Sequence, residues 1–122
     1  MTEEKSNTIV ELPPPVRCTL WEHPEKADAE FAEILEEVQS YEDTSHLTRA
    51  LYKCRECGQL YFYEWYEWVD WGGGNDRSYS TLLPVQTQEQ IEALKQTDIF
   101  GLMRYFPRLH LDEREPTWRG KS

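Results

Sequence analysis

The chain has 122 residues, with 23 acidic against 13 basic side chains and a formal net charge of −10 at pH 7. Nucleic acids and anionic membrane surfaces both attract proteins with a basic face, so this charge disfavours both as partners. Hydrophobic residues make up 39% of the chain and aromatic residues 13%, which is enough for one folded core. We therefore expect an acidic domain whose charge serves solubility or attracts a basic partner protein.

The chain contains no apolar run long enough to span a bilayer, and its polar, acidic first residues do not resemble a signal peptide. We expect a cytoplasmic protein, because a reducing compartment suits an odd count of three cysteines. Residues 1–15 are predicted to form a flexible arm that ends in the extended triplet Pro13–Pro15. Residues 16–122 are predicted to form a single α+β domain.

The segment 27–41 has the pattern of an amphipathic helix. Apolar side chains recur along it at the three- and four-residue spacing of one helical face, at Phe31, Ile34, Leu35 and Val38. Acidic side chains occupy the remaining faces, which indicates either a solvated surface or a negative patch for a basic partner. These acidic residues are Glu30, Glu33, Glu36 and Glu37.

Three segments predict the strands of a small antiparallel sheet. Leu47–Cys54 enters a tight turn, Gln59–Trp71 leaves it, and Arg77–Val85 returns after the glycine-rich turn at 72–74. The second strand carries large aromatic rings on both faces, so both faces should be at least partly covered. The sheet, with its hairpin around 59–85, is expected to pack against two or three helices.

The C-terminal third predicts one well-capped helix and a less regular end. Thr87 and Gln90 have the spacing of a capping box, which predicts a helix running to about Gln96. Asp98 is placed to cap a second short helix through Phe106. The remaining residues, 108–122, are expected to dock as an extended tail or to fray.

Cys54 and Cys57 are separated by two residues and followed directly by Gly58. Two thiolates at this spacing can occupy two corners of a zinc tetrahedron, and the glycine permits the tight turn behind them. Cys18 and His23 are the candidates for the other two corners, in an arrangement that resembles a zinc ribbon. A zinc ion with four protein ligands would be structural rather than catalytic.

Other interpretations of the cysteines remain open. Without a metal they are inert reduced thiols in a tight turn, and His46 and His110 compete with His23 as the histidine ligand. A thioredoxin-like redox role is disfavoured, because the residues after Cys57 predict a strand rather than the N-terminus of a helix.

The sequence contains no recognisable catalytic motif, and we expect no enzymatic activity. Glu64 and Asp70 share a strand face but lie about 20 Å apart, too far for paired carboxylate chemistry. The aromatic side chains around Glu67 leave one alternative open, an enzyme that acts on a small cationic ligand.

Four features carry a resemblance to a known class: the segment Leu51–Gly58, the aromatic strand around Tyr63–Trp65, Asp76 in the glycine-rich turn, and the pair Pro84–Val85. Together they resemble small acidic immunity-type proteins of bacterial polymorphic or contact-dependent toxin systems. This resemblance implies a cytoplasmic inhibitor that binds one toxin domain tightly and blocks its active site. The alternative is a zinc-ribbon-like adaptor that binds protein within a larger complex.

An acidic inhibitor suits such a partner, because toxin nucleases are typically basic and electrostatic steering accelerates association. Tight interfaces usually combine aromatic anchors with a polar rim. The residues expected to bind the partner are Glu30, Glu33, Glu36, Glu37, Glu64, Glu67, Asp70, Trp65, Tyr66 and Trp68.

Overall fold

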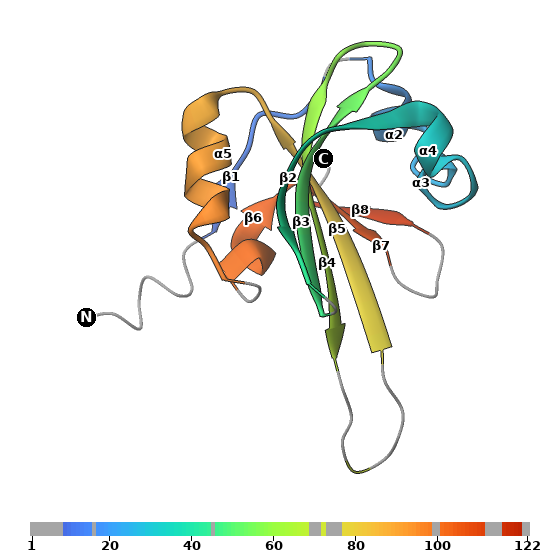
Figure 1. Ribbon diagram of the computed structural model, residues 1–122. Coiled ribbons are helices and arrows are strands. Elements are labelled where there is room, and N and C mark those ends of the chain that lie inside the picture. The colour runs from blue at the N-terminus through green and yellow to red at the C-terminus, as the bar shows by residue number, and fades with distance from the viewer. Residues whose placement is uncertain are drawn as a thin grey trace.

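A computed structural model describes residues 9–15, 17–44, 46–68, 72, 77–98, 101–111 and 116–120. Its centre is a six-stranded antiparallel sheet in the order β2-β3-β4-β5-β7-β8 (Figure 1). The expected α+β class, with an antiparallel sheet and helices, is confirmed. The strands are β2 (Leu35–Asp43), β3 (Leu47–Cys54), β4 (Leu60–Trp68), β5 (Arg77–Val85), β7 (Arg108–Leu111) and β8 (Thr117–Arg119).

Short helices and a small parallel strand pair surround this sheet. No helix in the described ranges is long and apolar enough to cross a membrane. The longest helix, α5, begins with the predicted capping box: the amide of Gln90 donates to Thr87, and the Gln90 side chain accepts from the Thr87 amide. The helices are α2 (Thr19–Glu22), α3 (Lys26–Ala29), α4 (Phe31–Ile34), α5 (Gln88–Lys95) and the 3₁₀ helix η1 (Gly101–Arg104); the parallel pair is β1 (Val10–Glu11) with β6 (Tyr105–Phe106).

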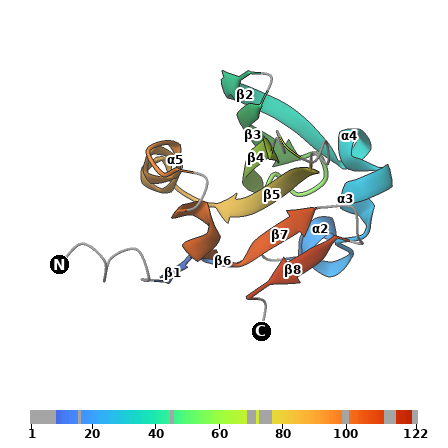
Figure 2. The same ribbon diagram turned by 90° about the horizontal axis from the view of Figure 1, so that it is seen from below.

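The sheet is buried on both faces, with α5 on one side and α2–α4 on the other (Figure 2). A separate hydrophobic core lies on each face of the sheet, and neighbouring residues of the central strand β4 enter different ones. Tyr61 joins the core beneath α2–α4, and Phe62 joins the core beneath α5 and η1. The expectation that both faces of this aromatic strand are covered is confirmed for the described part of β4.

The helix predicted over 27–41 is wrong beyond Ile34. Residues 35–43 instead form β2, the edge strand that pairs with β3. Two register shifts, near Val38 and Tyr41, break the two-residue alternation that would have signalled a strand. Val38, expected on the buried face of a helix, is 50% exposed. Pairing with β3 overrides the local helical pattern here.

Both ends of the described chain dock on the domain. Residues 1–8 of the predicted flexible arm lie outside the described ranges, but β1 pairs with β6 and the Leu12 side chain is buried. In the segment expected to be a tail, β7 and β8 extend the sheet. The indole Nε1 of Trp118 donates to the Leu20 carbonyl at 2.8 Å, which ties β8 to α2.

A buried ion pair joins the sheet to the end of α5. Arg49 and Glu64 are 4% and 3% exposed, and Arg49 Nη2 lies 2.7 Å from Glu64 Oε2. The same guanidinium donates to the carbonyls of Leu94, Lys95 and Thr97, which lie in or just after the last turn of the helix. A cation is favourable at this negative end of a helix. Burial raises the pKa of Glu64 above its ordinary value, against the attraction of Arg49.

We predict that Arg49→Met lowers the free energy of unfolding by about 3–5 kcal/mol, because it leaves the Glu64 carboxylate buried without its cation. The double variant Arg49→Met/Glu64→Leu should recover part of this loss. Urea unfolding measures both. Lys53→Met is the control: it removes a cation from the same strand, 3.8 Å from a half-exposed Glu36 carboxylate, and should cost no more than about 1 kcal/mol. Equal losses in Arg49→Met and Lys53→Met would contradict this account.

Candidate metal centre

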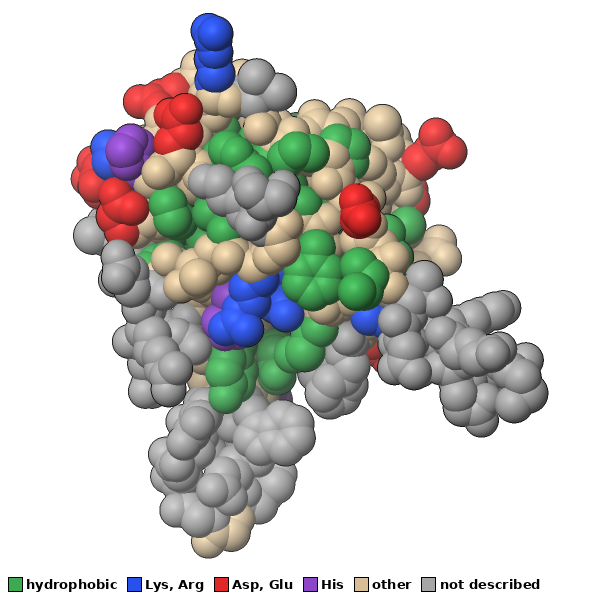
Figure 3. Space-filling model, turned by 180° about the vertical axis from the view of Figure 1, so that it is seen from behind, with side chains coloured by type: hydrophobic (Ala, Val, Ile, Leu, Met, Phe, Trp, Pro, Cys, Tyr) green, Lys and Arg blue, Asp and Glu red, His purple; other side chains and the backbone are tan. Residues whose placement is uncertain are grey.

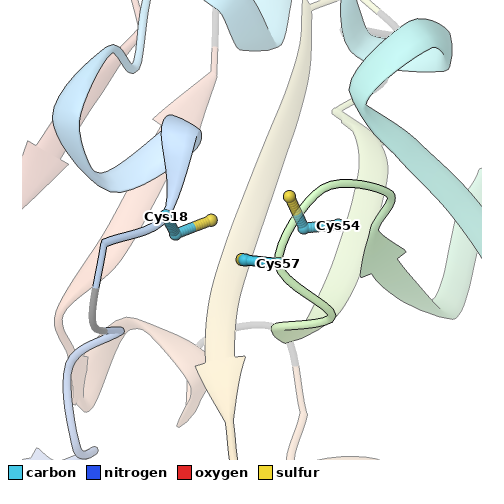
Figure 4. A group of neighbouring side chains, drawn as sticks. All are labelled: Cys18, Cys54 and Cys57. Carbon is cyan, nitrogen blue, oxygen red and sulfur yellow. The ribbon is translucent and has the colours of Figure 1, made fainter.

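Three cysteines from two distant segments meet beneath α2. The sulfur atoms of Cys18, Cys54 and Cys57 all lie within 4.8 Å of one another. Cys18 extends from the segment before α2 toward the loop between β3 and β4, which carries the other two (Figure 4). Cys18 and Cys54 are buried and Cys57 is exposed, so the group lies at the edge of the core and opens to solvent on one side. Its donor set is entirely sulfur.

The loop that carries Cys54 and Cys57 is a tight turn at the tip of a β-hairpin. The Gly58 amide donates to the Cys54 carbonyl at 2.9 Å, and the Cys54 amide donates to the Gln59 carbonyl at 2.8 Å. Gly58 has φ +83°, a conformation that residues with a Cβ rarely adopt. The predicted role of this glycine in the turn is confirmed.

Backbone amides within the turn point at one of the sulfurs. Burial by itself would raise the pKa of Cys54. Hydrogen bonds from the amides of Cys57 and Glu56, together with those from the Cys57 and Cys18 side chains, lower the pKa below the ordinary thiol value. The turn therefore supports a thiolate at Cys54, the form that binds metal ions.

Cys18 approaches from the other side with donors of its own. It occupies the position just before α2, and its sulfur accepts the Tyr61 hydroxyl at 2.9 Å and a hydrogen bond from the Leu20 backbone. Burial raises the pKa of Cys18 to about 12 despite these two donors. Burial and the Cys18 contact likewise raise the pKa of Tyr61. Tyr61 was not among the predicted site residues, although it lies only four positions after Cys57.

Two further contacts hold these segments together. The Thr19 hydroxyl donates to the Glu56 carboxylate, which joins the start of α2 to the cysteine turn. The Arg55 amide donates to the Ile34 carbonyl at 2.8 Å, which joins the same turn to the end of α4. Main-chain and side-chain contacts thus place Cys18 beside the turn.

The structure does not bring His23 into this group. Its imidazole is 57% exposed, and its Nδ1 lies 3.6 Å from a Glu25 carboxylate oxygen. The short helix α2 ends before His23 and carries it away from the sulfurs, so the predicted fourth ligand is wrong for this arrangement. The rival His46 contacts Glu67 at 3.0 Å, and His110 belongs to β7, so neither joins the three sulfurs.

The residues predicted to bind a partner do not form one surface. Glu33 and Glu37 are exposed near the cysteine turn, whereas Glu67 lies six residues from Tyr61 toward the far end of β4, about 20 Å away. Glu30 and Glu36 are half-buried and lie near the cysteine turn. Trp65 and Tyr66 are half-buried toward the far end of β4, where they lie on opposite faces of the strand. The side chain of Trp68 and all of Asp70 lie outside the described residues.

Glu64 was expected on the partner surface, and that expectation is wrong. Its carboxylate is buried under α5, where it pairs with Arg49. In the sequence, Glu64 lies between Phe62 and Tyr66 on one face of the strand. Two aromatic neighbours on that face indicate that a helix covers it.

Of the aromatic side chains expected around Glu67, which are Tyr63, Trp65 and Trp71, one lies in the core. Tyr63 packs edge-on against Phe31 and Tyr52 beneath α4, so its ring belongs to the core. Glu67 contacts His46 instead. Trp71 lies outside the described residues.

Comparisons with protein families, with curated proteins and with solved structures found no match to this chain. Its function is therefore inferred from the chemistry of the site itself.

We predict that Gly58→Ala destabilises the protein by about 1–2 kcal/mol, because alanine must adopt the left-handed conformation of the turn. Gly72→Ala is the matched control: its added Cβ meets no atom within 4 Å and its φ lies outside that region, so it should be neutral or slightly stabilising. The measurement is the melting temperature of each variant. A Gly58→Ala variant as stable as Gly72→Ala would show that the turn does not impose this backbone conformation.

Proposed function

We propose that this protein is a zinc-stapled protein-binding module, in which one Zn²⁺ bound by Cys18, Cys54 and Cys57 joins the N-terminal segment to the β3–β4 hairpin. The observation that carries the proposal is that three sulfurs lie within 4.8 Å of one another although Cys18 is 36 residues before Cys54 and 39 before Cys57. Thiolates are the preferred ligands of structural zinc.

The geometry of the sulfurs supports a metal over inert thiols. Zinc–sulfur bonds of about 2.3 Å place tetrahedral ligands about 3.8 Å apart, so closing the site requires the sulfurs to move by no more than about 1 Å. Amide donors to Cys54 and the Tyr61 hydroxyl on Cys18 are outer contacts of the kind that orient and stabilise metal-bound thiolates. A bound dication would also relieve the repulsion among three thiolates held this close.

The exposed side of Cys57 leaves room for a fourth ligand. Within the described residues no histidine or carboxylate completes the tetrahedron. Water or a group from a partner protein would serve, and either keeps the metal at the surface, where a partner can reach it.

We predict one zinc per chain in protein purified without chelators, measured by elemental analysis. Removing it should lower the melting temperature by 10 °C or more, on the order of the folding energy that a structural zinc contributes. Cys54→Ser should lose the metal and the same stability. Affinity should fall as pH falls, because protons compete for the three thiolates.

His23→Ala is the control for this experiment, because His23 lies outside the sulfur group. It should keep both the zinc and the melting temperature of the parent protein. Loss of zinc in His23→Ala would restore histidine as a ligand. A parent protein that contains no zinc and melts unchanged after chelation would refute the staple.

We further propose that the module inhibits a basic protein, as immunity-type proteins do, through the acidic side chains beside the cysteine turn. The net charge of −10 supports a basic partner. Glu33 and Glu37 are exposed near the turn, and the described residues place no cation within 4 Å of either. Glu36 is different, since it faces Lys53 and Arg55.

Inhibition is tested by expressing this protein together with a basic toxin whose gene lies beside its own, and by measuring whether cell growth is rescued. We predict that Glu33→Lys/Glu37→Lys slows association with the toxin at least tenfold at low salt and weakens rescue. Glu89→Lys/Glu92→Lys is the matched control, with the same charge change on α5, and should do neither. Rescue that is insensitive to both pairs would refute the acidic surface. Stable incorporation into a resident complex without any rescue would favour the adaptor alternative.

A further inference from the structure

Two arginines face each other on the C-terminal strand pair. Arg108 of β7 and Arg119 of β8 are register partners, so their side chains leave the same face of the sheet. Cβ atoms of such partners are about 5 Å apart, and like charges placed directly opposite each other are destabilising. The proximity of Arg119 is one reason why the pKa of Arg108 lies below its ordinary value, after the effect of burial.

Neither arginine has a carboxylate within 4 Å among the described residues. This is notable in a chain with 23 acidic residues to 13 basic ones. The Nε of Arg108 is buried, and the described structure gives it no hydrogen-bond partner. A buried guanidinium nitrogen without an acceptor is costly, so an acceptor is expected at this position.

The surroundings fix the Arg108 guanidinium rather than leave it free. Its carbon lies 5.3 Å from the centre of the Phe106 ring. The Phe106 ring in turn packs directly on the backbone of Gly120, the residue after Arg119. A Cβ atom placed on this glycine would lie only 2.7 Å from the ring. A held guanidinium loses less entropy on binding an anion than a mobile one does.

The space-filling view shows basic and histidine side chains gathered at the centre of one face, with hydrophobic side chains around them (Figure 3). His110 lies two residues after Arg108 on the same strand and so on the same face. Arg108, Arg119 and His110 favour an anionic ligand on this face. Glu64 lines the same small hollow as Arg108 and His110, but its carboxylate is paired with Arg49.

We propose that Arg108 and Arg119 together form an oxyanion-binding site, for a phosphate or carboxylate group that bridges the two guanidiniums. The anion would neutralise the like-charge contact and would accept hydrogen bonds from the terminal guanidinium nitrogens, which unlike Nε are not among the buried, unpaired atoms. Guanidiniums bind both kinds of oxyanion through paired N–H donors. The site is separate from the proposed metal centre, whose ligands lie on other segments.

The experiment adds inorganic phosphate, acetate or chloride at equal ionic strength and follows the melting temperature. Phosphate or acetate at ten times its dissociation constant should raise it by about 5 °C over chloride. A rise with phosphate alone assigns the site to phosphate groups, and an equal rise with acetate assigns it to carboxylates. In parallel, NMR should show the largest oxyanion-dependent shifts at the guanidinium resonances of Arg108 and Arg119.

Arg119→Gln tests the arginine pair without disturbing the core, since Arg119 is exposed. The substitution should abolish the rise in melting temperature on addition of the oxyanion. In chloride at low salt, the variant should melt slightly above the parent, because the repulsion between the two arginines is gone. Arg55→Gln is the control: it removes an exposed arginine that lies 3.9 Å from Glu36, and it should retain the full oxyanion effect. An oxyanion effect that is absent in the parent, or unchanged in Arg119→Gln, would overturn the proposal.

Discussion

The burial of β4 on both faces is the constraint from which the rest of the fold follows. Tyr61 and Phe62 are adjacent in sequence and enter different cores, so one layer of structure on each side of the sheet is obligatory. Short helices from the N-terminal third cover one face, and α5 with η1 covers the other. Because none of the described helices exceeds eight residues, their stability must come from packing on the sheet rather than from helix propensity.

Each face is secured by one polar cluster that joins segments distant in sequence. On one face, Arg49 and Glu64 hold the end of α5 through a buried ion pair and the last carbonyls of the helix. On the other, Cys18 is placed against the cysteine turn, with the Tyr61 hydroxyl on its sulfur. The side chains of Arg49, Glu64, Cys18 and Cys54 are all buried, and a buried charge that loses its partner costs more free energy than a buried pair contributes. The ion pair carries its own counter-charge, whereas in the proposed metal site the bound ion would supply the counter-charge of the thiolates.

Local signals in the sequence predicted the parts of the fold that local chemistry determines. The cysteine turn with Gly58, the strand over 47–54 and the capping box at Thr87 all depend on residues within a few positions of one another. The helix expected over 27–41 failed because pairing with β3, a long-range interaction, decides the structure of residues 35–43. Glu64 and His23 failed for the same reason: burial and ligation depend on which distant segments arrive nearby, and one strand or one spacing does not encode that.

Metal binding and the acidic surface beside the turn reinforce each other in the proposed function. Once three thiolates hold one Zn²⁺, the site carries a net charge of −1, since three negative charges outweigh two positive ones. Glu33 and Glu37 lie beside that turn, and the Arg55 amide already ties it to α4. Loading with zinc would therefore order the turn and fix a negative charge beside these two carboxylates at the same time. A basic partner would sense both changes, because association by electrostatic steering depends on the field and tight docking depends on a surface that is already ordered.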